Sequence, residues 1–204
     1  HFVREGIIWN RRNGSGQFIR KGGKKSHDIK PHVRLSGGKH ADMYMNPDMV
    51  CDPGLIQSIA EQLIVPTNSS IPASEVYKIN RVVAPQKGGS ILAYALATAI
   101  TNLHERGFEP CKYTLLQKEG VNKQGPKFKQ IGNPIQIGEA ILICDDVLTT
   151  ARTVLAIDKL VQKCGARTVF VTVLAIDSSF VALPGLPVNA LCVKRTKLYD
   201  SDNC

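Results

Sequence analysis

The feature that most constrains the fold is an apolar run at residues 140–144, which ends in two adjacent carboxylates, Asp145 and Asp146. Five apolar residues without polar alternation favour a strand that is buried on both faces of a parallel sheet. The acidic pair then falls at the carboxyl end of this strand, where open α/β sheets bind ligands. Hydroxyl and small residues follow, and then a helical pattern whose start can offer backbone N–H groups to a phosphate. The segment therefore predicts a site for a sugar phosphate, whose hydroxyls would meet the carboxylates.

Strand and helix patterns alternate along the chain from residue 52 onward. Asp52 and Pro53 have the residue types of a helix cap and a first helical position, and an apolar face follows them to about residue 64. Further strands are predicted at Val82, at 113–116, at Ile141 and at 167–176, and further helices at 89–102 and 153–163. Residues 67–75 are expected to form a polar linker. The alternation predicts an α/β fold, a doubly wound parallel sheet with helices on both faces.

Composition agrees with a globular chain. A length of 204 residues with 43% hydrophobic residues suits one domain with a substantial core. No apolar run is long enough to cross a bilayer and no signal-peptide pattern is visible, so we expect no membrane partner and a cytoplasmic location. The six cysteines show neither CxxC pairs nor metal-ligand spacing, and we expect reduced thiols: Cys51, Cys111, Cys144, Cys164, Cys192 and Cys204.

Positive charge is concentrated at the amino-terminal end. Residues 1–40 contain ten Lys and Arg against two acidic residues, and so carry eight of the nine net positive charges. We therefore divide the chain into a basic, Gly-rich extension at 1–32 and a main domain at 33–204. The extension could contact nucleic acid phosphates, collect an anionic substrate or lie disordered. Its aromatic residues are sparse, and we do not expect nucleic acid to be the main partner.

The segment around Asp145 resembles the phosphoribosyl pyrophosphate (PRPP) signature of the type I phosphoribosyltransferases. The resemblance implies that Asp145 and Asp146 hold the ribose hydroxyls. It also implies that the following loop holds the 5′-phosphate, through Leu148, Thr149, Thr150, Ala151, Arg152 and Thr153. Arg152 departs from the family pattern, in which a small residue, often Gly, is usual at this position. A solvated acidic pair before an ordinary helix would give a similar pattern.

Residues 81–93 read as a strand, a tight Gly-containing loop and a helix, and they resemble the pyrophosphate-binding loop of orotate phosphoribosyltransferases. The resemblance implies that Gln86, Lys87 and Gly88 bind pyrophosphate, with Lys87 as the matching lysine. Glycine lets the backbone approach an oxyanion closely, and lysine supplies a point charge. An ordinary strand-to-helix turn would need the glycine but not the lysine.

Two further segments resemble the orotate enzymes. Residues 33–40 and the Tyr44-Met45-Asn46 stretch are similar to their amino-terminal segment, which implies a small hood and a base-binding role for Tyr44 and Met45. Residues 116–120 open a polar stretch to Gly132 that is similar to a mobile loop closing over pyrophosphate. In those enzymes a strand ending in Arg-Lys-Glu leads into the loop; Lys118 matches its lysine, while Gln117 stands where its arginine is expected. The loop bases Lys123, Lys127 and Lys129 follow, and a basic solvated hairpin is the alternative interpretation.

The resemblance implies a phosphoribosyltransferase that takes PRPP and a nitrogenous base, with Mg²⁺ bound to Asp145 and Asp146 indirectly, through PRPP. Lys87, Lys118 and Lys123 would be its catalytic residues, and a homodimer is expected. A pyrimidine such as orotate is favoured as the base, but Ser178 stands where the orotate enzymes have arginine, so orotate itself is expected to be a poor acceptor. The alternative hypothesis is a catalytically weak, regulatory PRPP- or nucleotide-binding protein of the same fold, with nucleic acid contacts at its basic end.

Overall fold

The computed structural model describes residues 8–10, 33–34, 40–41, 43–45, 52–64, 72–104, 109–122, 125–177, 180, 182–195 and 197–199. The chain divides into two compact units. One unit comprises His1–Cys51 together with Lys194–Cys204, and the other comprises Asp52–Val193. The candidate site residues at the predicted phosphate and pyrophosphate loops all belong to the second unit.

The smaller unit contains short strands. β1 (Ile8–Asn10) pairs antiparallel with β4 (Met43–Met45), and β3 (His40–Ala41) lies between β2 (Val33–Arg34) and β11 (Leu198–Tyr199). β1 falls inside the stretch predicted to be a basic extension. The predicted boundary at residue 32 therefore separates segments that pair with each other, and a distinct role for the extension stays a prediction.

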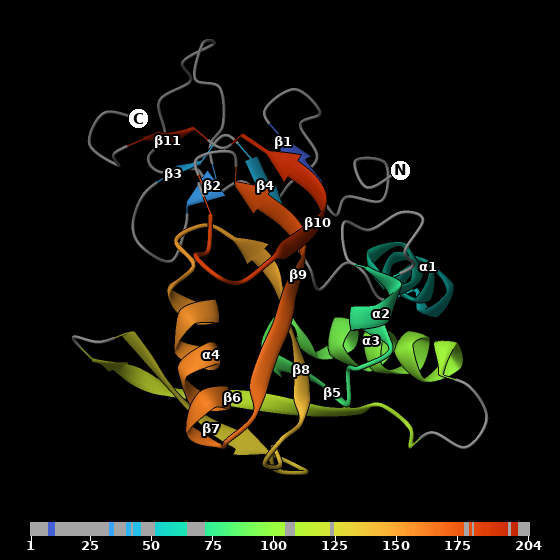
Figure 1. Cartoon of the computed structure of the whole chain (residues 1–204). Coiled ribbons are helices and arrows are strands. Elements are labelled where there is room, and N and C mark those ends of the chain that lie inside the picture. Colours follow the sequence, from blue (N-terminus) through green and yellow to red (C-terminus); the bar gives the residue numbers. More distant parts are fainter. Residues whose placement is uncertain are drawn as a thin grey trace, which may run out of the picture. The chain divides into compact units, whose positions relative to one another are not determined.

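A six-stranded sheet forms the larger unit, in the order β10-β9-β8-β5-β6-β7 (Figure 1). Its strands are β5 (Arg81–Pro85), β6 (Lys112–Asn122), β7 (Gly125–Ile131), β8 (Ala140–Leu148), β9 (Arg167–Asp177) and β10 (Val188–Lys194). β5 runs parallel to both β6 and β8, and β8 runs parallel to β9. The chain first moves from β5 to β6 and then crosses back to β8, so the strand order reverses between β5 and β8. Ligands bind at such reversal points in open α/β sheets.

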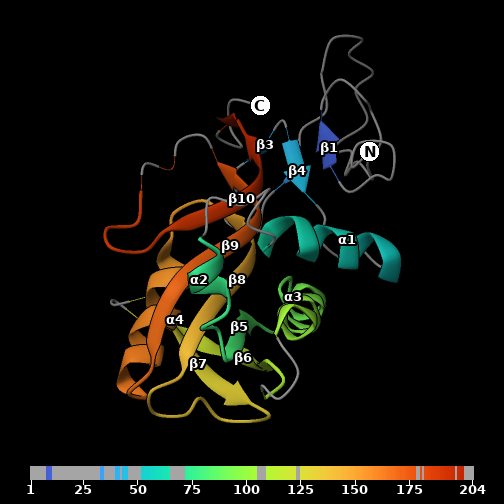
Figure 2. The ribbon, with the colours of Figure 1, turned by 45° about the vertical axis from the view of Figure 1, so that its right-hand side comes forward.

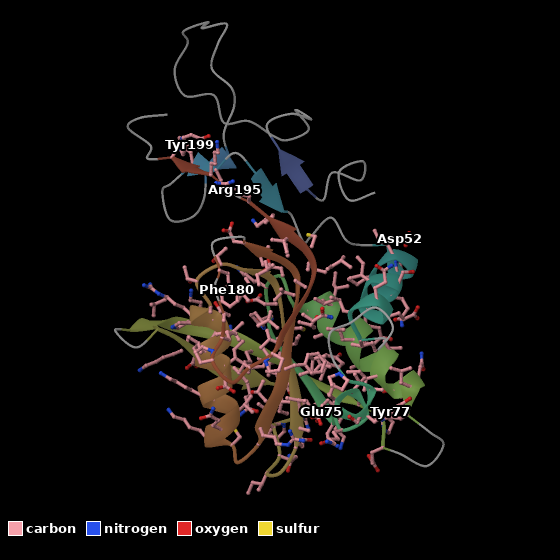
Figure 3. The ribbon with its side chains drawn as sticks, turned by 45° about the horizontal axis from the view of Figure 1, so that its top comes forward. Asp52, Glu75, Tyr77, Phe180, Arg195 and Tyr199 are labelled. Carbon is pink, nitrogen blue, oxygen red and sulfur yellow. The ribbon has the colours of Figure 1, made fainter. Side chains whose placement is uncertain are left out.

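Helices cover both faces of this sheet, as predicted (Figures 1 and 2). α3 (Ser90–Leu103) packs on β5, β6 and β8, and α1 (Pro53–Ile64) packs on α3. α4 (Arg152–Lys163) lies on the opposite face, against β7, β8 and β9. α1 begins where the sequence predicts, next to Asp52 (Figure 3). Asp52 caps the helix, because its Oδ1 accepts a hydrogen bond of 2.7 Å from the Leu55 N–H. The predicted linker is wrong at its end, where a helical turn, α2 (Ala73–Val76), forms.

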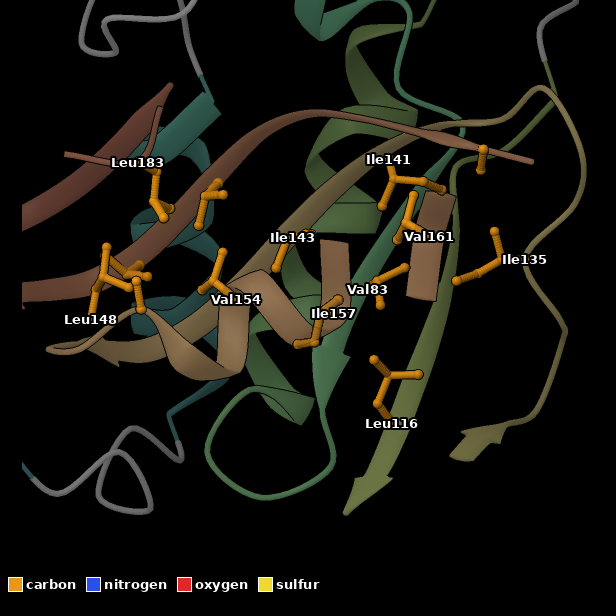
Figure 4. Packing of buried hydrophobic residues seen from close by; sticks show 14 residues of the cluster. Val83, Leu116, Ile135, Ile141, Ile143, Leu148, Val154, Ile157, Val161 and Leu183 are labelled. Carbon is orange, nitrogen blue, oxygen red and sulfur yellow. The ribbon is translucent and has the colours of Figure 1, made fainter. Parts of the chain in front are cut away.

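The apolar run at 140–144 is buried along its whole length, as a central strand between two helical layers requires. Val83, Ile141 and Ile143 contribute to the core cluster beneath α4, which also includes Val154 and Ile157 from the helix (Figure 4). α4 ends at a left-handed Gly165, with φ +73°, where the sequence predicts its stop. Burial of these side chains fixes the position of β8 and therefore of the acidic pair at its end.

An ion pair lies at the other edge of the sheet, where the parallel strands begin. Arg81 is 1% exposed and donates to Glu139 through Nε and Nη2, at 2.7 and 2.8 Å. Its Nη1 donates to Thr114 Oγ1 at 2.9 Å. Burial opposes ionisation of Glu139, but the hydrogen bonds from Arg81 and from the Gln136 backbone lower its pKa below the ordinary value. The pair therefore joins β5, β6 and the start of β8.

The polar stretch predicted as a mobile loop is mostly strand. β6 and β7 form a long antiparallel ribbon, with Leu115 opposite Ile131 at its base and Asn122 opposite Gly125 near its tip. The pairing register shifts between Lys118 and Gly120. The alternative interpretation of this stretch, a basic hairpin, therefore describes its backbone correctly. The part of the chain that the structure describes contains no helix long and apolar enough to span a membrane.

Candidate active site

Two turns meet where the strand order reverses, one after β5 and one after β8. β5 and β8 are neighbours in register, with Val83 opposite Ile143, so their carboxyl ends lie at the same edge of the sheet. Gly88, in the turn after β5, has φ +85°, and a Cβ added to it would lie 2.6 Å from Asp146 Oδ2. The structure thus brings the predicted pyrophosphate loop against the predicted ribose-binding carboxylates.

The acidic pair ends β8 in a fixed orientation. The Asp146 N–H donates to Asp145 Oδ1 at 2.9 Å, and the Val147 N–H donates to Asp146 Oδ1 at 2.6 Å. Asp145 is 8% exposed, while Asp146 is half-buried. Burial, and then the neighbouring charge of Asp146, raise the pKa of Asp145 well above its ordinary value. A ligand that donates hydrogen bonds would stabilise such a buried carboxyl group, and ribose hydroxyls are donors of this kind.

The turn after β8 leads directly into α4. Thr149 and Thr150 are exposed, and Ala151 has the left-handed conformation φ +58°, ψ 0° with its side chain in the core cluster. Neither a side-chain cap nor an acidic residue occupies the first turn of α4. Its backbone N–H groups, together with the positive end of the helix dipole, can therefore bind an anion such as a phosphate.

Ala151 and Arg152 differ in backbone conformation. The family resemblance implies a small residue, often Gly, at the position of Arg152, and this stays a prediction. In the structure Arg152 is the exposed first residue of α4, and the position whose backbone favours glycine is Ala151. Alanine thus occupies the left-handed position, and Arg152 stands one residue further, at the helix start.

The turn after β5 is tied to β6. The Gln86 N–H donates to the Leu116 carbonyl at 2.9 Å, and the Ser90 hydroxyl donates to the Gln86 carbonyl. Lys87 is exposed on this turn. Lys118 is also exposed and lies on β6 two residues beyond Leu116, which is paired with Pro85. Gln86, Lys87 and Lys118 therefore reach the same edge of the sheet as Asp145 and Asp146.

Other predicted site residues fall elsewhere. Tyr44 and Met45 lie in β4 of the smaller unit, opposite Trp9 and Ile8, and their part in base binding stays a prediction. Lys123 and Ser178 lie outside the described residues. Among the described residues, no group of three or more His, Cys, Asp or Glu side chains could hold a metal ion by itself.

Comparison with known proteins decides the family. The sequence pattern of the phosphoribosyl transferase domain matches residues 56–180, which include both turns and the acidic pair. The chain belongs to this family. It is a phosphoribosyltransferase, and so a glycosyltransferase by class, as its motifs predicted.

Similar proteins extend the match over most of the chain. The orotate phosphoribosyltransferase of Campylobacter jejuni is 26% identical over 191 residues, covering 86% of this chain and 85% of that protein. That of Desulforamulus reducens is 26% identical over 174 residues, covering 85% and 81%.

Solved structures show the same fold. The orotate phosphoribosyltransferase of Aeropyrum pernix has a TM-score of 0.63 at 16% identity, covering 94% of this chain and 90% of that one. An adenine phosphoribosyltransferase from Thermoanaerobacter pseudethanolicus has a TM-score of 0.56 at 17% identity, covering 74% and 88%.

Proposed function

We propose that this phosphoribosyltransferase moves the 5-phosphoribosyl group from PRPP to a pyrimidine base such as orotate and releases pyrophosphate. The observation that carries the proposal is the contact of Gly88 with the Asp146 carboxylate, because it joins a candidate pyrophosphate loop and a candidate ribose site at one sheet edge. The similarity to proteins named orotate phosphoribosyltransferase, over most of the chain, supports a pyrimidine acceptor.

Each half of the site takes one part of PRPP. Asp145 and Asp146 accept hydrogen bonds from the ribose hydroxyls, and the 5′-phosphate binds the uncapped N–H groups at the start of α4, within the loop 148–153. Exposed Thr149 and Thr150 add hydroxyl donors. Arg152, at the helix start, adds a positive charge close to the phosphate.

Reaction at C1′ breaks the bond to pyrophosphate and forms a bond to a ring nitrogen of the base, whose proton passes to the released pyrophosphate. Positive charge builds on the ribose ring and negative charge on the leaving pyrophosphate. Lys87, Lys118 and Lys123 stabilise the leaving group through their ammonium charges. Asp145 and Asp146 hold the ribose in place while C1′ moves from one partner to the other.

The acidic pair also suits Mg²⁺. Magnesium is usually bound by one or two carboxylates together with substrate phosphates, rather than by a cage of protein side chains. Asp145 and Asp146 supply carboxylate oxygens without a third acidic, His or Cys ligand among the described residues, which fits a metal held mainly by PRPP. When bound, the ion neutralises charge on the pyrophosphate.

We propose a homodimer that uses the outer face of α3. Ile91 and Tyr94 are 47% and 61% exposed, and Tyr94 meets Tyr113 of β6 edge-to-face, with ring centroids 6.0 Å apart. The helix has no charged residue over its whole length. A two-fold interface places a patch against its own copy, so an uncharged apolar face is self-complementary. Sedimentation should show a dimer that Tyr94→Glu converts to monomers; a dimer unaffected by this change would refute the proposed face.

A cytoplasmic location is proposed because of the cysteines. Four of them are free thiols in the described part of the chain: Cys111, Cys144, Cys164 and Cys192. Burial raises the pKa of the Cys111 thiol to about 12, and that of Cys144 also lies above its ordinary value. These thiols are therefore unreactive, and it is the presence of several free thiols, rather than their pKa, that suits a reducing compartment.

Incubation with PRPP, Mg²⁺ and a panel of bases tests the proposed function. Orotate, uracil, hypoxanthine, guanine, adenine and xanthine would be compared by pyrophosphate release and nucleotide formation. We expect a pyrimidine to react best, and orotate to react slowly, because Ser178 cannot replace the guanidinium that would pair with its carboxylate. Preference for a purine would overturn the pyrimidine assignment.

Calorimetry of PRPP binding provides the matching test of the site. The Asp145→Asn/Asp146→Asn double variant should lose PRPP affinity by at least about 100-fold, because two charged acceptors are removed. Unchanged affinity would refute the ribose site. Tight PRPP binding without turnover of any base would instead favour the regulatory alternative, which the replacement of arginine by Gln117 motivates.

A further inference from the structure

Lys118 and Phe128 form a directly opposed pair on the ribbon of β6 and β7. Residues opposite each other in an antiparallel pair project from the same face of the sheet. The two side chains differ in exposure: Lys118 is exposed, whereas Phe128 is partly buried and packs against the core cluster beneath α4. A candidate leaving-group lysine thus stands beside an apolar anchor of its own hairpin.

The neighbouring pair, Leu116 and Gln130, shows which face of the sheet carries Lys118 and Phe128. Leu116 belongs to the core cluster and lies opposite Gln130. Gln130 Nε2 donates to Sγ of Cys164 at 3.4 Å, at the end of α4. The face that carries Leu116, Lys118, Phe128 and Gln130 is therefore the face toward α4, which also contacts β7.

Pairing becomes irregular just beyond Lys118. The register shifts between Lys118 and Gly120, and Val121, further along, is 69% exposed. The ribbon thus has a base that is packed on the core and an outer part that is not. Lys118 and Phe128 stand at the outer end of the packed base, and Phe128 packs on the core cluster there.

We propose that Phe128 is a positioning residue for phosphoribosyl transfer, which anchors the ribbon and so holds Lys118 at the departing pyrophosphate. The inference rests on the proposed role of Lys118. A lysine side chain is long and flexible, so the place of its ammonium depends on how well its backbone is fixed. Misplacing a catalytic group by about 1 Å can lower the rate by about 100-fold.

A double-mutant cycle between Phe128 and Lys118 tests the proposal. Phe128→Ala should lower kcat by about 10- to 100-fold, while binding of the nucleoside monophosphate, which lacks pyrophosphate, should not change. In the Lys118→Ala background the same change should lower kcat less than about twofold, because the group that Phe128 positions is already gone. Phe128→Leu, which keeps an apolar anchor, should restore most of the activity.

Leu186→Ala is the matched control, because Leu186 packs on the same core cluster from the connection between β9 and β10. It should lower the melting temperature about as much as Phe128→Ala but leave kcat unchanged. An equal loss of kcat in both backgrounds, or a loss of kcat in Leu186→Ala matching that of Phe128→Ala, would overturn the proposal.

Pyrophosphate binding, measured by calorimetry on the same four proteins of the cycle, separates this inference from the proposed function. If no base reacts with the wild type, the proposed function fails, yet the binding cycle still reports the coupling. Weaker pyrophosphate binding in Phe128→Ala that disappears in the Lys118→Ala background would support the positioning role. Additive effects on binding would overturn it.

Discussion

Gly88 lies against the carboxylate of Asp146 so closely that a Cβ on Gly88 would come within 2.6 Å of Asp146 Oδ2 and 3.0 Å of its Cγ. No side chain fits in this space. The residue also has φ +85°, a conformation that glycine adopts without strain. Two independent features therefore demand glycine at this position, and both serve to bring the turn after β5 to the acidic pair.

Gly88→Ala should reduce both stability and PRPP binding. The left-handed backbone costs a side chain about 1–2 kcal/mol, and the contact must push the Asp146 carboxylate aside. We expect PRPP affinity to fall at least about tenfold, as for the loss of one charged hydrogen bond. Denaturant unfolding and calorimetry would measure the two effects.

Gly138→Ala is the control for this substitution. Gly138 has φ +81°, but an added Cβ would meet nothing within 4 Å. It should cost a similar free energy of unfolding through the backbone alone and leave PRPP affinity unchanged. Equal loss of affinity in both variants would show that the contact with Asp146 is not what matters.

Asp145 should make the free protein less stable as the pH rises. Burial, followed by the charge of Asp146, raises its folded pKa well above the unfolded value of about 3.9. Between these two pKa values the folded state keeps a proton that the unfolded state has lost, so stability falls with increasing pH. Asp145→Asn cannot ionise, and should therefore be more stable than the wild type at pH 7.

The stability difference between Asp145→Asn and the wild type should shrink as the pH falls through about 4 and vanish well below the unfolded pKa of about 3.9, where Asp145 is protonated in both states. Chemical unfolding from pH 3 to 8 would measure it, and PRPP binding would be lost at every pH. A wild type that equals or exceeds the variant in stability at pH 7 would show that Asp145 is stabilised as a carboxylate in the free protein.

The central strands and the start of α1 were predictable from sequence because the residue pattern within each single segment indicates its structure. The apolar run before Asp145 favours a buried strand, and Asp52 with Pro53 indicates a helix start from neighbouring residues alone. The ribbon was predicted as a loop because its polar stretch resembles a mobile loop of the orotate enzymes, whereas its strands depend on pairing Leu115 with Ile131. Propensity does not reveal such a partner.

Contacts between distant segments were also beyond sequence reasoning. The motifs singled out both Gly88 and Asp146, but nothing in either motif states that one touches the other. The Arg81 pair with Glu139 was not predicted, since a charged residue at the start of an apolar strand usually indicates an exposed strand end. The sequence places Ala151 in the phosphate loop, but only its φ shows that it takes the position suited to glycine.

Substitutions at Ala151 should distinguish it from Arg152 as the position suited to glycine. Glycine at 151 removes about 1–2 kcal/mol of backbone strain, but loses a buried methyl group worth about 0.8 and adds unfolded-state entropy worth about 0.4–1. These terms largely cancel, so Ala151→Gly should be neutral within about 0.8 kcal/mol. Ala151→Val should destabilise by more than about 2 kcal/mol, because a β-branched residue resists positive φ.

Arg152→Val serves as the comparison, because Arg152 is exposed and helical. The change should cost less than about 0.7 kcal/mol, the spread of helix propensities. Thermal and denaturant unfolding of the three variants would rank them. A larger loss of unfolding free energy for Arg152→Val than for Ala151→Val would contradict Ala151 as the position suited to glycine.

Glu139→Gln should destabilise the larger unit through Arg81. Arg81 would stay buried without its anion. Removing one partner of a buried ion pair costs about 3–5 kcal/mol, and we expect the lower end of this range because Glu139 is partly exposed. Since the folded pKa of Glu139 is lowered, its contribution is present above the unfolded pKa of about 4.3 and is lost as the pH falls through the folded value. The difference from wild type should therefore shrink in acid.

Glu75→Gln provides the control, because Glu75 forms a surface pair with Lys78. It should change stability far less, as exposed ion pairs contribute little. Urea unfolding at pH 7 and pH 3 would compare the two variants. If Glu139→Gln were as mild as Glu75→Gln at pH 7, the buried pair would not be what joins the starts of β5, β6 and β8.

The ribbon should become protected from protease when its ligand is bound. Lys118, Lys127 and Lys129 lie on its strands and are exposed, so each offers a site for trypsin. Cleavage requires the backbone to leave the β6–β7 ladder, and ammonium groups that contact bound pyrophosphate oppose this opening. We expect cleavage within the ribbon to slow at least about fivefold with PRPP and Mg²⁺, and Lys118→Ala to abolish most of the protection. Cleavage at equal rates with and without ligand would show that the ribbon is a solvated hairpin that takes no part in holding pyrophosphate.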